Sequence, residues 1–396
     1  MDEIFAKINY DINISCYKKE YMFHMEHLRN NLFSSLKKDT IFSKIYNGVY
    51  LKGSYGDNLK VKYPDEYDLV FRLKLPEYKR IILLRDQRVP GNVILDFTNV
   101  FHTIANQKQH AESYKQLKKW VTEKNFLSVR LLQSWLESRF TKALSDLNKQ
   151  VIYENVASAI TYRKQGPAHT IFMNNPYKYS VDFVPAIVLS SSQALLNTIT
   201  GDWDAIPKPL KNTPREISFR ASYDSLEHDI IKDKKSLKNA LRIMKKFRDR
   251  HQNMSNLKSY YIKTLFLWRA SKERTYFWNQ SISCVVIELF NDLKTSLQKC
   301  KLPYFWDGNL NLYENIGESS LLEMRKCVEN KAATLAKFKG LRGMADNDNY
   351  RVYAIFLTEA ERLKMGMQKN GTIPFLPQPE ENEQTSTSHW PKCSVS

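Results

Sequence analysis

Residues 51–73 read LKGSYGDNLKVKYPDEYDLVFRL, and the fold assignment depends on this stretch. A Gly-Ser pair at 53–54 precedes Glu66 and Asp68, which lie two positions apart at the start of an apolar segment. In a β-strand, residues two apart project from the same face, so the two carboxylates are expected side by side. Adjacent carboxylates repel each other unless a cation lies between them, and Mg²⁺ prefers carboxylate oxygens. The stretch predicts a metal site on a sheet, although an isolated pair of this kind also suits a solvated strand edge.

A third carboxylate, Asp182, lies within YSVDFVPAIVL (179–189), a strand with apolar residues on both sides. Burying an unpaired carboxylate is costly, and a shared cation would remove that cost. Glu66, Asp68 and Asp182 are therefore the candidate catalytic residues and ligands of two Mg²⁺ or Mn²⁺ ions. Such a set suits two-metal phosphoryl transfer, with Asp182 also the candidate general base.

The Gly-Ser pair fits the same chemistry. Gly53 would let the backbone approach a phosphate closely, and Ser54 would offer an N–H and a hydroxyl at a helix N-terminus. Neither GxxxxGK[ST] nor GxGxxG occurs in the chain, so P-loop and Rossmann nucleotide sites have no support. Together these motifs predict a nucleotidyltransferase.

The composition limits the class of protein. The 396 residues are enough for two lobes, because single cores rarely grow past roughly 250–300 residues. Sixty Lys and Arg against 42 Asp and Glu give a net charge of +18, which would attract a polyanion such as nucleic acid. Five scattered cysteines form no CxxC motif or His/Cys cluster, which predicts a reducing compartment and no zinc. The start has no cationic segment followed by an apolar run, so we expect a cytoplasmic protein without a membrane partner.

Hydrophobic periodicity predicts an α+β architecture. Apolar residues at three- and four-residue steps over 14–36 indicate a long amphipathic helix. Short β-rich segments follow, interrupted by a helix over 116–147, and 201–214 is typical of a Pro-rich linker. Helical patterns then fill 226–366. The predicted domains are a mixed-sheet catalytic lobe with the long helix (1–205), an all-helical lobe (206–366) and a disordered tail (367–396).

These motifs resemble the cyclic GMP-AMP synthase-like receptor family of Mab-type nucleotidyltransferases. In that family a GS turn precedes an acidic-hydrophobic-acidic strand, as in GSYGDNLKVKYPDEYDLVF (53–71). FRASYDSLEHDII (219–231) resembles the segment that opens the second lobe, and SYYIKT (259–264) resembles the nucleotide-stacking segment. The resemblance covers most of residues 10–330. It implies a bilobed nucleotidyltransferase with an N-terminal spine helix, which makes cyclic GMP-AMP from ATP and GTP.

The resemblance also implies roles for individual residues. Glu66, Asp68 and Asp182 would be metal ligands, and Ser54 would contact the triphosphate. The other implied nucleotide contacts are Arg220 and Ser222 at the acceptor base, Lys245 and Ser259 at the donor phosphates, and Tyr260 stacked on a base. Taken singly, Tyr260 also suits a core aromatic residue, and Lys245 suits a solvated helix face. Asp224 stands where cyclic GMP-AMP synthases carry a serine, which leaves nucleotide preference open.

Two basic sets lie where this family binds double-stranded nucleic acid. Residues 230–250 hold nine Lys and Arg against two acids, and the long first helix adds more. The candidate nucleic-acid contacts are Lys18, Lys19, Arg29, Lys37, Lys38, Lys232, Lys234, Lys235, Lys238 and Arg242. Residues 230–241 run into a helix without the zinc insertion of vertebrate members, which by analogy favours double-stranded RNA over DNA. A dimer on the nucleic acid is compatible with the sequence.

The implied function is an antiviral sensor of innate immunity whose product acts on a STING-type receptor. Two other interpretations share the motifs. A template-independent RNA polymerase of the poly(A) or CCA-adding type has the same GS and acidic elements, but it lengthens RNA ends. A non-catalytic scaffold of the same fold is the third, and three converging carboxylates argue against it. The sequence leaves the phosphodiester linkage open.

Overall fold

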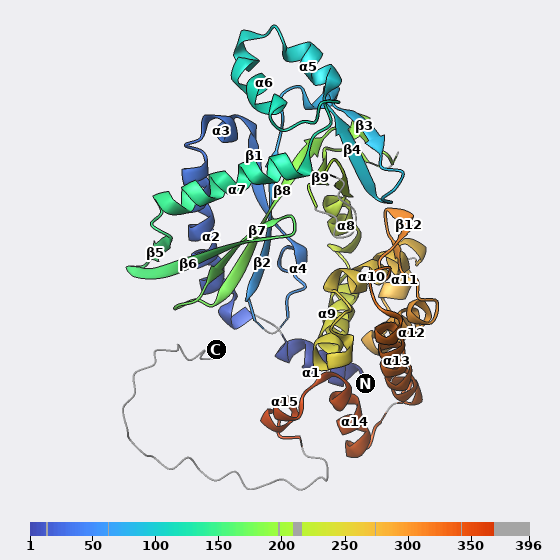
Figure 1. Cartoon of the computed structure of the whole chain (residues 1–396). Coiled ribbons are helices and arrows are strands. Elements are labelled where there is room, and N and C mark those ends of the chain that lie inside the picture. Colours follow the sequence, from blue (N-terminus) through green and yellow to red (C-terminus); the bar gives the residue numbers. More distant parts are fainter. Residues whose placement is uncertain are drawn as a thin grey trace.

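The computed structural model describes residues 1–12, 15–61, 63–196, 199–208, 216–273, 275–341 and 343–367. In these residues the chain forms a lobe built on a mixed β-sheet and a second lobe built from helices (Figure 1). The predicted α+β class is therefore confirmed. Apart from residue 367, the predicted tail lies outside the described residues. Among the helices described, none has the length and apolar character that a membrane span requires.

The helices of the described residues are α1 (Asp2–Asp11), α2 (Ser15–Leu36), α3 (Thr40–Ile45), α4 (Gly53–Gly56), α5 (Thr98–Ile104), α6 (Ala111–Lys118), α7 (Val129–Asp146), α8 (Asp224–Ile231), α9 (Lys235–Arg250), α10 (Ser259–Lys272), α11 (Thr275–Trp278), α12 (Ile282–Gln298), α13 (Glu318–Lys337), α14 (Asp346–Phe356) and α15 (Glu359–Lys364). The strands are β1 (Tyr46–Lys52), β2 (Glu66–Leu73), β3 (Ile82–Arg85), β4 (Asn92–Asp96), β5 (Gln150–Tyr153), β6 (Val156–Gln165), β7 (Ala168–Met173), β8 (Tyr179–Leu189), β9 (Trp203–Ile206), β10 (Phe219–Ser222), β11 (Pro303–Tyr304) and β12 (Asp307–Asn311).

The large sheet has the order β3-β4-β10-β9-β8-β7-β6-β5, and β2 pairs with the remaining edge of β8 while β1 pairs with β2. The pairing of β2 with β8 is parallel, and its register places Asp68 directly opposite Asp182. Directly opposed residues on neighbouring strands project from the same face. The register therefore brings together carboxylates that are more than a hundred residues apart in the sequence.

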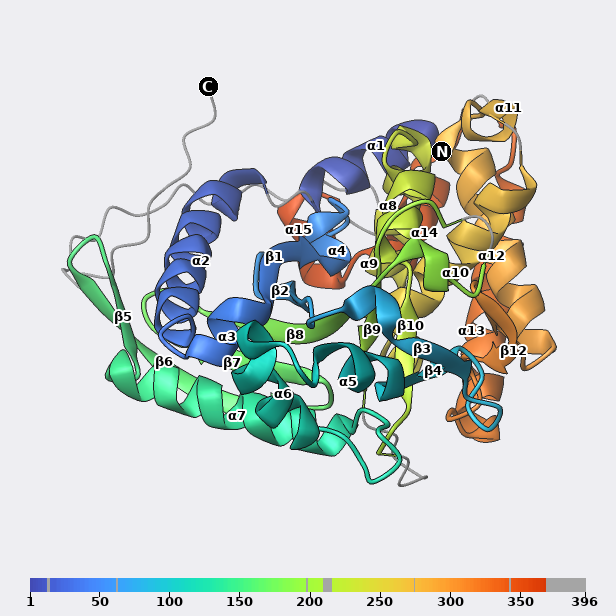
Figure 2. The same ribbon diagram turned by 90° about the horizontal axis from the view of Figure 1, so that it is seen from above.

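The two faces of β2 have different environments. Tyr67, Leu69, Phe71 and Leu73 alternate along the strand and are fully buried. The ring of Phe71 lies 5.7 Å from Phe33 of α2 and 5.8 Å from Phe140 of α7, so these helices cover this face. Figure 2 shows α7 and α4 on opposite sides of the sheet. The acidic residues are thus left on the face that looks toward the helical lobe.

The helical lobe has its own core, in which Phe247 of α9 packs against Phe290 of α12 at 4.8 Å. The N-terminal helix α1 belongs to this core, since Phe5 contacts Phe356 of α14 at 5.5 Å. The sheet also takes in β10, which pairs with β4 and β9. The two cores therefore do not separate at residue 205, because α1 packs with the second lobe and β10 with the first.

Two local predictions differ from the structure. The single helix expected over 116–147 is two helices, α6 and α7, separated by residues 119–128, where Val121 and Leu127 form a β-bridge. The segment expected to be a linker contains β9, in which Trp203 is buried. In both cases tertiary packing determines the structure, because the flanking apolar residues join the sheet core.

Candidate active site

Three carboxylates meet on the exposed face of the sheet. Glu66 and Asp68 lie on β2 and Asp182 lies on β8, and one oxygen from each lies within 4.8 Å of the others. Glu66 is exposed, whereas Asp68 and Asp182 are half-buried. Burial, together with the charges of Glu66 and Asp182, raises the pKa of Asp68 to about 7. A divalent cation would relieve this repulsion, and the oxygen donors are those that Mg²⁺ and Mn²⁺ prefer, so the residues present fit the predicted metal.

The Gly53–Ser54 turn lies directly over this cluster. Gly53 has φ +60° and begins the short helix α4. A Cβ atom at this position would lie 1.9 Å from Oδ2 of Asp68. The glycine is therefore required by the close approach of the turn to a carboxylate, in a backbone conformation that other residues rarely adopt. The prediction that Ser54 lies at a helix N-terminus agrees with its position in α4.

Ser54 and Lys245 come from different lobes and meet at the turn. Lys245 Nζ of α9 donates to Ser54 Oγ at 2.9 Å and to the carbonyl oxygen of Leu59 at 2.8 Å. Lys245 is buried, and burial lowers its pKa to about 8. It is therefore not the solvated lysine that its Lys-rich helix suggests. The contact places a serine hydroxyl and an ammonium group side by side, an arrangement suited to binding phosphate.

Thr170 also belongs to this site, although no sequence motif pointed to it. It lies on β7 opposite Asp182, is 1% exposed, and donates a hydrogen bond from Oγ1 to Asp182 Oδ1 at 2.6 Å. Burial raises the pKa of Asp182, and this hydrogen bond opposes the rise. The bond occupies one carboxylate oxygen and leaves the other for the acidic cluster. Only the strand register reveals this partnership.

Lys60 is a second such residue. Its ammonium group lies 2.7 Å from Asp65 and 3.4 Å from Glu66, and its side chain is 12% exposed. The residue follows Leu59, whose carbonyl oxygen binds Lys245. Lys60 therefore lies between the acidic cluster and the Ser54–Lys245 pair.

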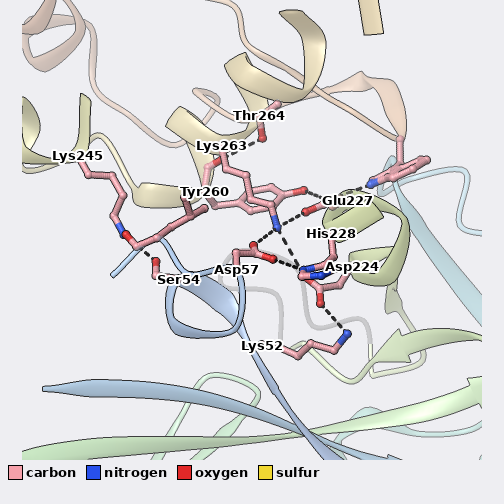
Figure 3. A network of polar contacts seen from close by, with 12 residues as sticks. Lys52, Ser54, Asp57, Asp224, Glu227, His228, Lys245, Tyr260, Lys263 and Thr264 are labelled. Atoms are coloured by element: carbon pink, nitrogen blue, oxygen red, sulfur yellow. Dashed lines mark hydrogen bonds and ion pairs between the residues drawn. The ribbon is translucent and has the colours of Figure 1, made fainter. Parts of the chain in front are cut away.

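A network of buried charges joins the turn to the helical lobe (Figure 3). At its centre Lys263 Nζ of α10 lies 2.8 Å from Asp57, 3.0 Å from Glu227 and 3.7 Å from Asp224. These carboxylates raise the pKa of Lys263 despite its burial. Asp224 also pairs with Lys52 at 3.0 Å. Asp57 ends the turn that carries Ser54, so one lysine links that turn to α8 and α10.

The residues predicted to contact bases form a separate group. Tyr260 donates to Glu227 at 2.7 Å, and its ring centroid lies 6.3 Å from that of Tyr304. The guanidinium carbon of Arg220 lies 5.5 Å from the same Tyr304 ring. Tyr260 is half-buried, and the hydrogen bond to Glu227 fixes its hydroxyl group.

The other two predicted serine contacts lie on different elements, Ser222 on β10 and Ser259 at the start of α10. Ser222 lies opposite Asp204 in the pairing of β10 with β9. Ser259 accepts a hydrogen bond from Arg248 Nη1 at 2.5 Å, next to the start of α10. Arg248 was not selected from the sequence, because its helix is rich in basic residues throughout. The structure places it beside a predicted phosphate contact.

The predicted nucleic-acid contacts are spread over α2, the segment after it, and the region from the end of α8 through α9. Lys19, Lys37, Lys38, Lys232 and Lys235 are exposed, and Lys18, Arg29, Lys234, Lys238 and Arg242 are half-buried. The nine basic residues counted over 230–250 are not all on the surface. Lys245 and Lys246 are buried, and Lys246 forms an ion pair with Glu361. The surface charge of α9 is therefore lower than its sequence indicates.

Comparison with known proteins agrees with this geometry. The Mab-21 protein nucleotidyltransferase domain matches residues 55–233, and the Mab-21 protein HhH/H2TH-like domain matches residues 236–330. A cyclic GMP-AMP synthase-like receptor of Lucilia cuprina is 43% identical over 340 residues, covering 85% of this chain and 92% of its own length. Cyclic GMP-AMP synthase-like receptor 1 of Drosophila erecta is 35% identical over 396 residues, covering 96% of this chain and 88% of its own length. Receptor 2 of Drosophila melanogaster is 39% identical over 325 residues, covering 77% and 70%.

Proposed function

The chain belongs to the cyclic GMP-AMP synthase-like receptor family and is a nucleotidyltransferase, and from this premise we propose that it joins ATP and GTP into cyclic GMP-AMP when it binds double-stranded RNA. The observation that carries the proposal is the convergence of Glu66, Asp68 and Asp182 within 4.8 Å on neighbouring strands. The product would act on a STING-type receptor in antiviral defence.

The residues of the site have complementary roles in this proposal. Glu66, Asp68 and Asp182 would hold two Mg²⁺ or Mn²⁺ ions, which activate the attacking hydroxyl and stabilise the leaving pyrophosphate when bound. Asp182 would accept the proton of the attacking hydroxyl. Ser54, Lys245 and Ser259 would bind the phosphates of the donor nucleotide. Tyr260 would stack on a base and Arg220 would contact the acceptor base.

The contacts of Asn58 support activation by nucleic acid. This residue has φ +61° and follows the turn that carries Ser54. Lys18 Nζ of α2 donates to its side-chain oxygen at 3.4 Å, and Arg242 Nη1 of α9 donates to its carbonyl oxygen at 3.3 Å. Both cations are predicted to bind nucleic acid. A duplex that draws these two side chains to its phosphates would therefore release contacts on the catalytic turn.

A template-independent RNA polymerase is the second candidate function, because it would use the same carboxylates and the same turn. The two functions differ in product. A cyclic dinucleotide synthase yields a small molecule that resists phosphatase, whereas a polymerase yields RNA with a longer 3′ end.

The test is to incubate the purified protein with radiolabelled ATP and GTP and Mg²⁺ or Mn²⁺. One reaction contains no nucleic acid, a second contains duplex DNA and a third contains duplex RNA. Each reaction is repeated with Asp68→Asn. We expect a phosphatase-resistant small product only with duplex RNA and wild-type protein. If the small product forms only with duplex DNA, the activator is DNA and not RNA. Lengthened RNA would favour the polymerase.

A further inference from the structure

Lys60 is a nearly buried cation between two groups that the proposed function uses. On one side its ammonium group contacts Glu66 at 3.4 Å and Asp65 at 2.7 Å. On the other side the preceding residue, Leu59, binds Lys245 through its carbonyl oxygen and donates from its N–H to the carbonyl oxygen of Ser54 at 2.7 Å. The backbone that carries Lys60 is thus fixed to the predicted phosphate contacts.

The charge of Lys60 acts on both groups. It pairs with Asp65 and Glu66, and the neighbouring carbonyl oxygen of Leu59 accepts a hydrogen bond from Lys245. A lysine ammonium has three N–H donors. The contacts described use two of them, with Asp65 and Glu66, and one remains for another acceptor.

The position of the Lys60 ammonium group becomes unfavourable when a metal-bound nucleotide enters the site. Divalent ions at Glu66, Asp68 and Asp182 would repel the ammonium group of Lys60, which now pairs with Glu66. A triphosphate held by Ser54 and Lys245 would present anionic oxygens next to that group. The favourable movement for Lys60 is therefore from carboxylate to phosphate, by rotation of its side chain and without movement of the backbone.

We propose that Lys60 is a further substrate-binding residue, which neutralises the acidic cluster in the free protein and binds the triphosphate once the metal ions and nucleotide are present. This inference rests on the proposed function for the identity of the site. Lys60 would be a third side chain that binds the triphosphate, in addition to Ser54 and Lys245. The inference also makes Lys60 a competitor of the metal ions in the absence of nucleotide.

The first test is Mn²⁺ binding without nucleotide, measured from the free-Mn²⁺ EPR signal. Lys60→Met should bind Mn²⁺ about three- to tenfold more tightly than wild type, because a competing positive charge is removed. Asp68→Asn should bind more weakly. Lys339→Met is the matched control, since Lys339 forms a lysine–glutamate contact of the same 3.4 Å length with Glu288 in the helical lobe and should leave Mn²⁺ binding unchanged.

The second test is binding of α,β-methylene ATP at saturating Mg²⁺. Lys60→Met should weaken binding by about tenfold or more, and Lys60→Arg should restore most of it. Tighter Mn²⁺ binding with weaker nucleotide binding is a combination that a purely structural lysine does not produce. Weaker Mn²⁺ binding, or unchanged nucleotide binding, would overturn the inference.

The controls keep the result interpretable. If Lys60→Met fails to fold, Lys60→Gln removes the same charge and keeps a polar side chain, and the same two measurements apply. Wild-type protein that makes no cyclic dinucleotide would remove the proposed product. The opposite shifts in Mn²⁺ and nucleotide binding would still assign Lys60 to a nucleotide site.

Discussion

Thr170→Val removes a hydroxyl from beside the acidic cluster and keeps the shape of the side chain. In the structure Thr170 Oγ1 donates to Asp182 Oδ1 at 2.6 Å, and Thr170 is 1% exposed, so water cannot replace the hydroxyl without disturbing the packing. A hydrogen bond to a charged group contributes about 1.5–3 kcal/mol. Residues that orient metal ligands typically change metal affinity or activity by about 10- to 100-fold. At about 1.4 kcal/mol for each factor of ten, the two ranges agree.

We therefore expect Thr170→Val to lower kcat by about 10- to 100-fold and to weaken Mn²⁺ binding. The KM values for nucleotides should change little, because Thr170 does not line the predicted base or phosphate contacts. Thr170→Ser retains the hydroxyl and should remain close to wild type. Ser296→Ala, which removes a buried hydroxyl that bonds Tyr313 in the helical lobe, controls for lost stability. Equal kcat and Mn²⁺ affinity in Thr170→Val and Thr170→Ser would refute the reasoning.

Three other predictions concern stability and the two basic sites. Lys263→Met leaves the buried carboxylates around it uncompensated and should lower the free energy of unfolding by about 3–5 kcal/mol, so an unchanged Tm would contradict the network. Burial lowers the pKa of His24 to about 4. The unfolded chain therefore binds a proton at this histidine at a higher pH than the folded chain does, so the free energy of unfolding should fall by up to about 3 kcal/mol as pH drops from 6.5 toward 4. His24→Gln should flatten this pH dependence in denaturant titrations. Charge reversal at Lys235 and Lys238 should weaken duplex binding and reduce its salt dependence. Lys245→Ala should impair nucleotide binding and leave duplex affinity unchanged. An equal loss of duplex affinity in both variants would contradict the assignment of Lys245 to the nucleotide site.

The acidic residues could be found from the sequence because their signal is local. Glu66 and Asp68 are two apart on a strand, so their shared face follows from strand geometry. Asp182 stands out as a charge in an apolar strand. Their convergence needs the parallel register of β2 with β8, which the structure shows and which no pattern within a single segment predicts.

The residues of the site that the sequence analysis did not select lack such a local signal. Thr170 and Lys60 are ordinary residue types whose importance comes from their contacts with carboxylates in and beside the acidic cluster, and Lys263 lies in a helix with no unusual charge pattern. The misassigned β9 has a similar cause. Four residues beside several prolines resemble a linker, but Trp203 and Ala205 are buried because β8 and β10 lie on either side of them. Long-range pairing decides these cases, and periodicity within one segment does not contain it.

The most direct measurement is the mass of the product that the purified protein forms from ATP and GTP in the presence of divalent metal and duplex RNA. We expect a molecule that contains one AMP and one GMP unit, carries no terminal phosphate, and is absent when Asp68→Asn replaces the wild type. A linear dinucleotide that accumulates, a lengthened RNA or no new product would contradict the assignment of this chain as a cyclic dinucleotide synthase.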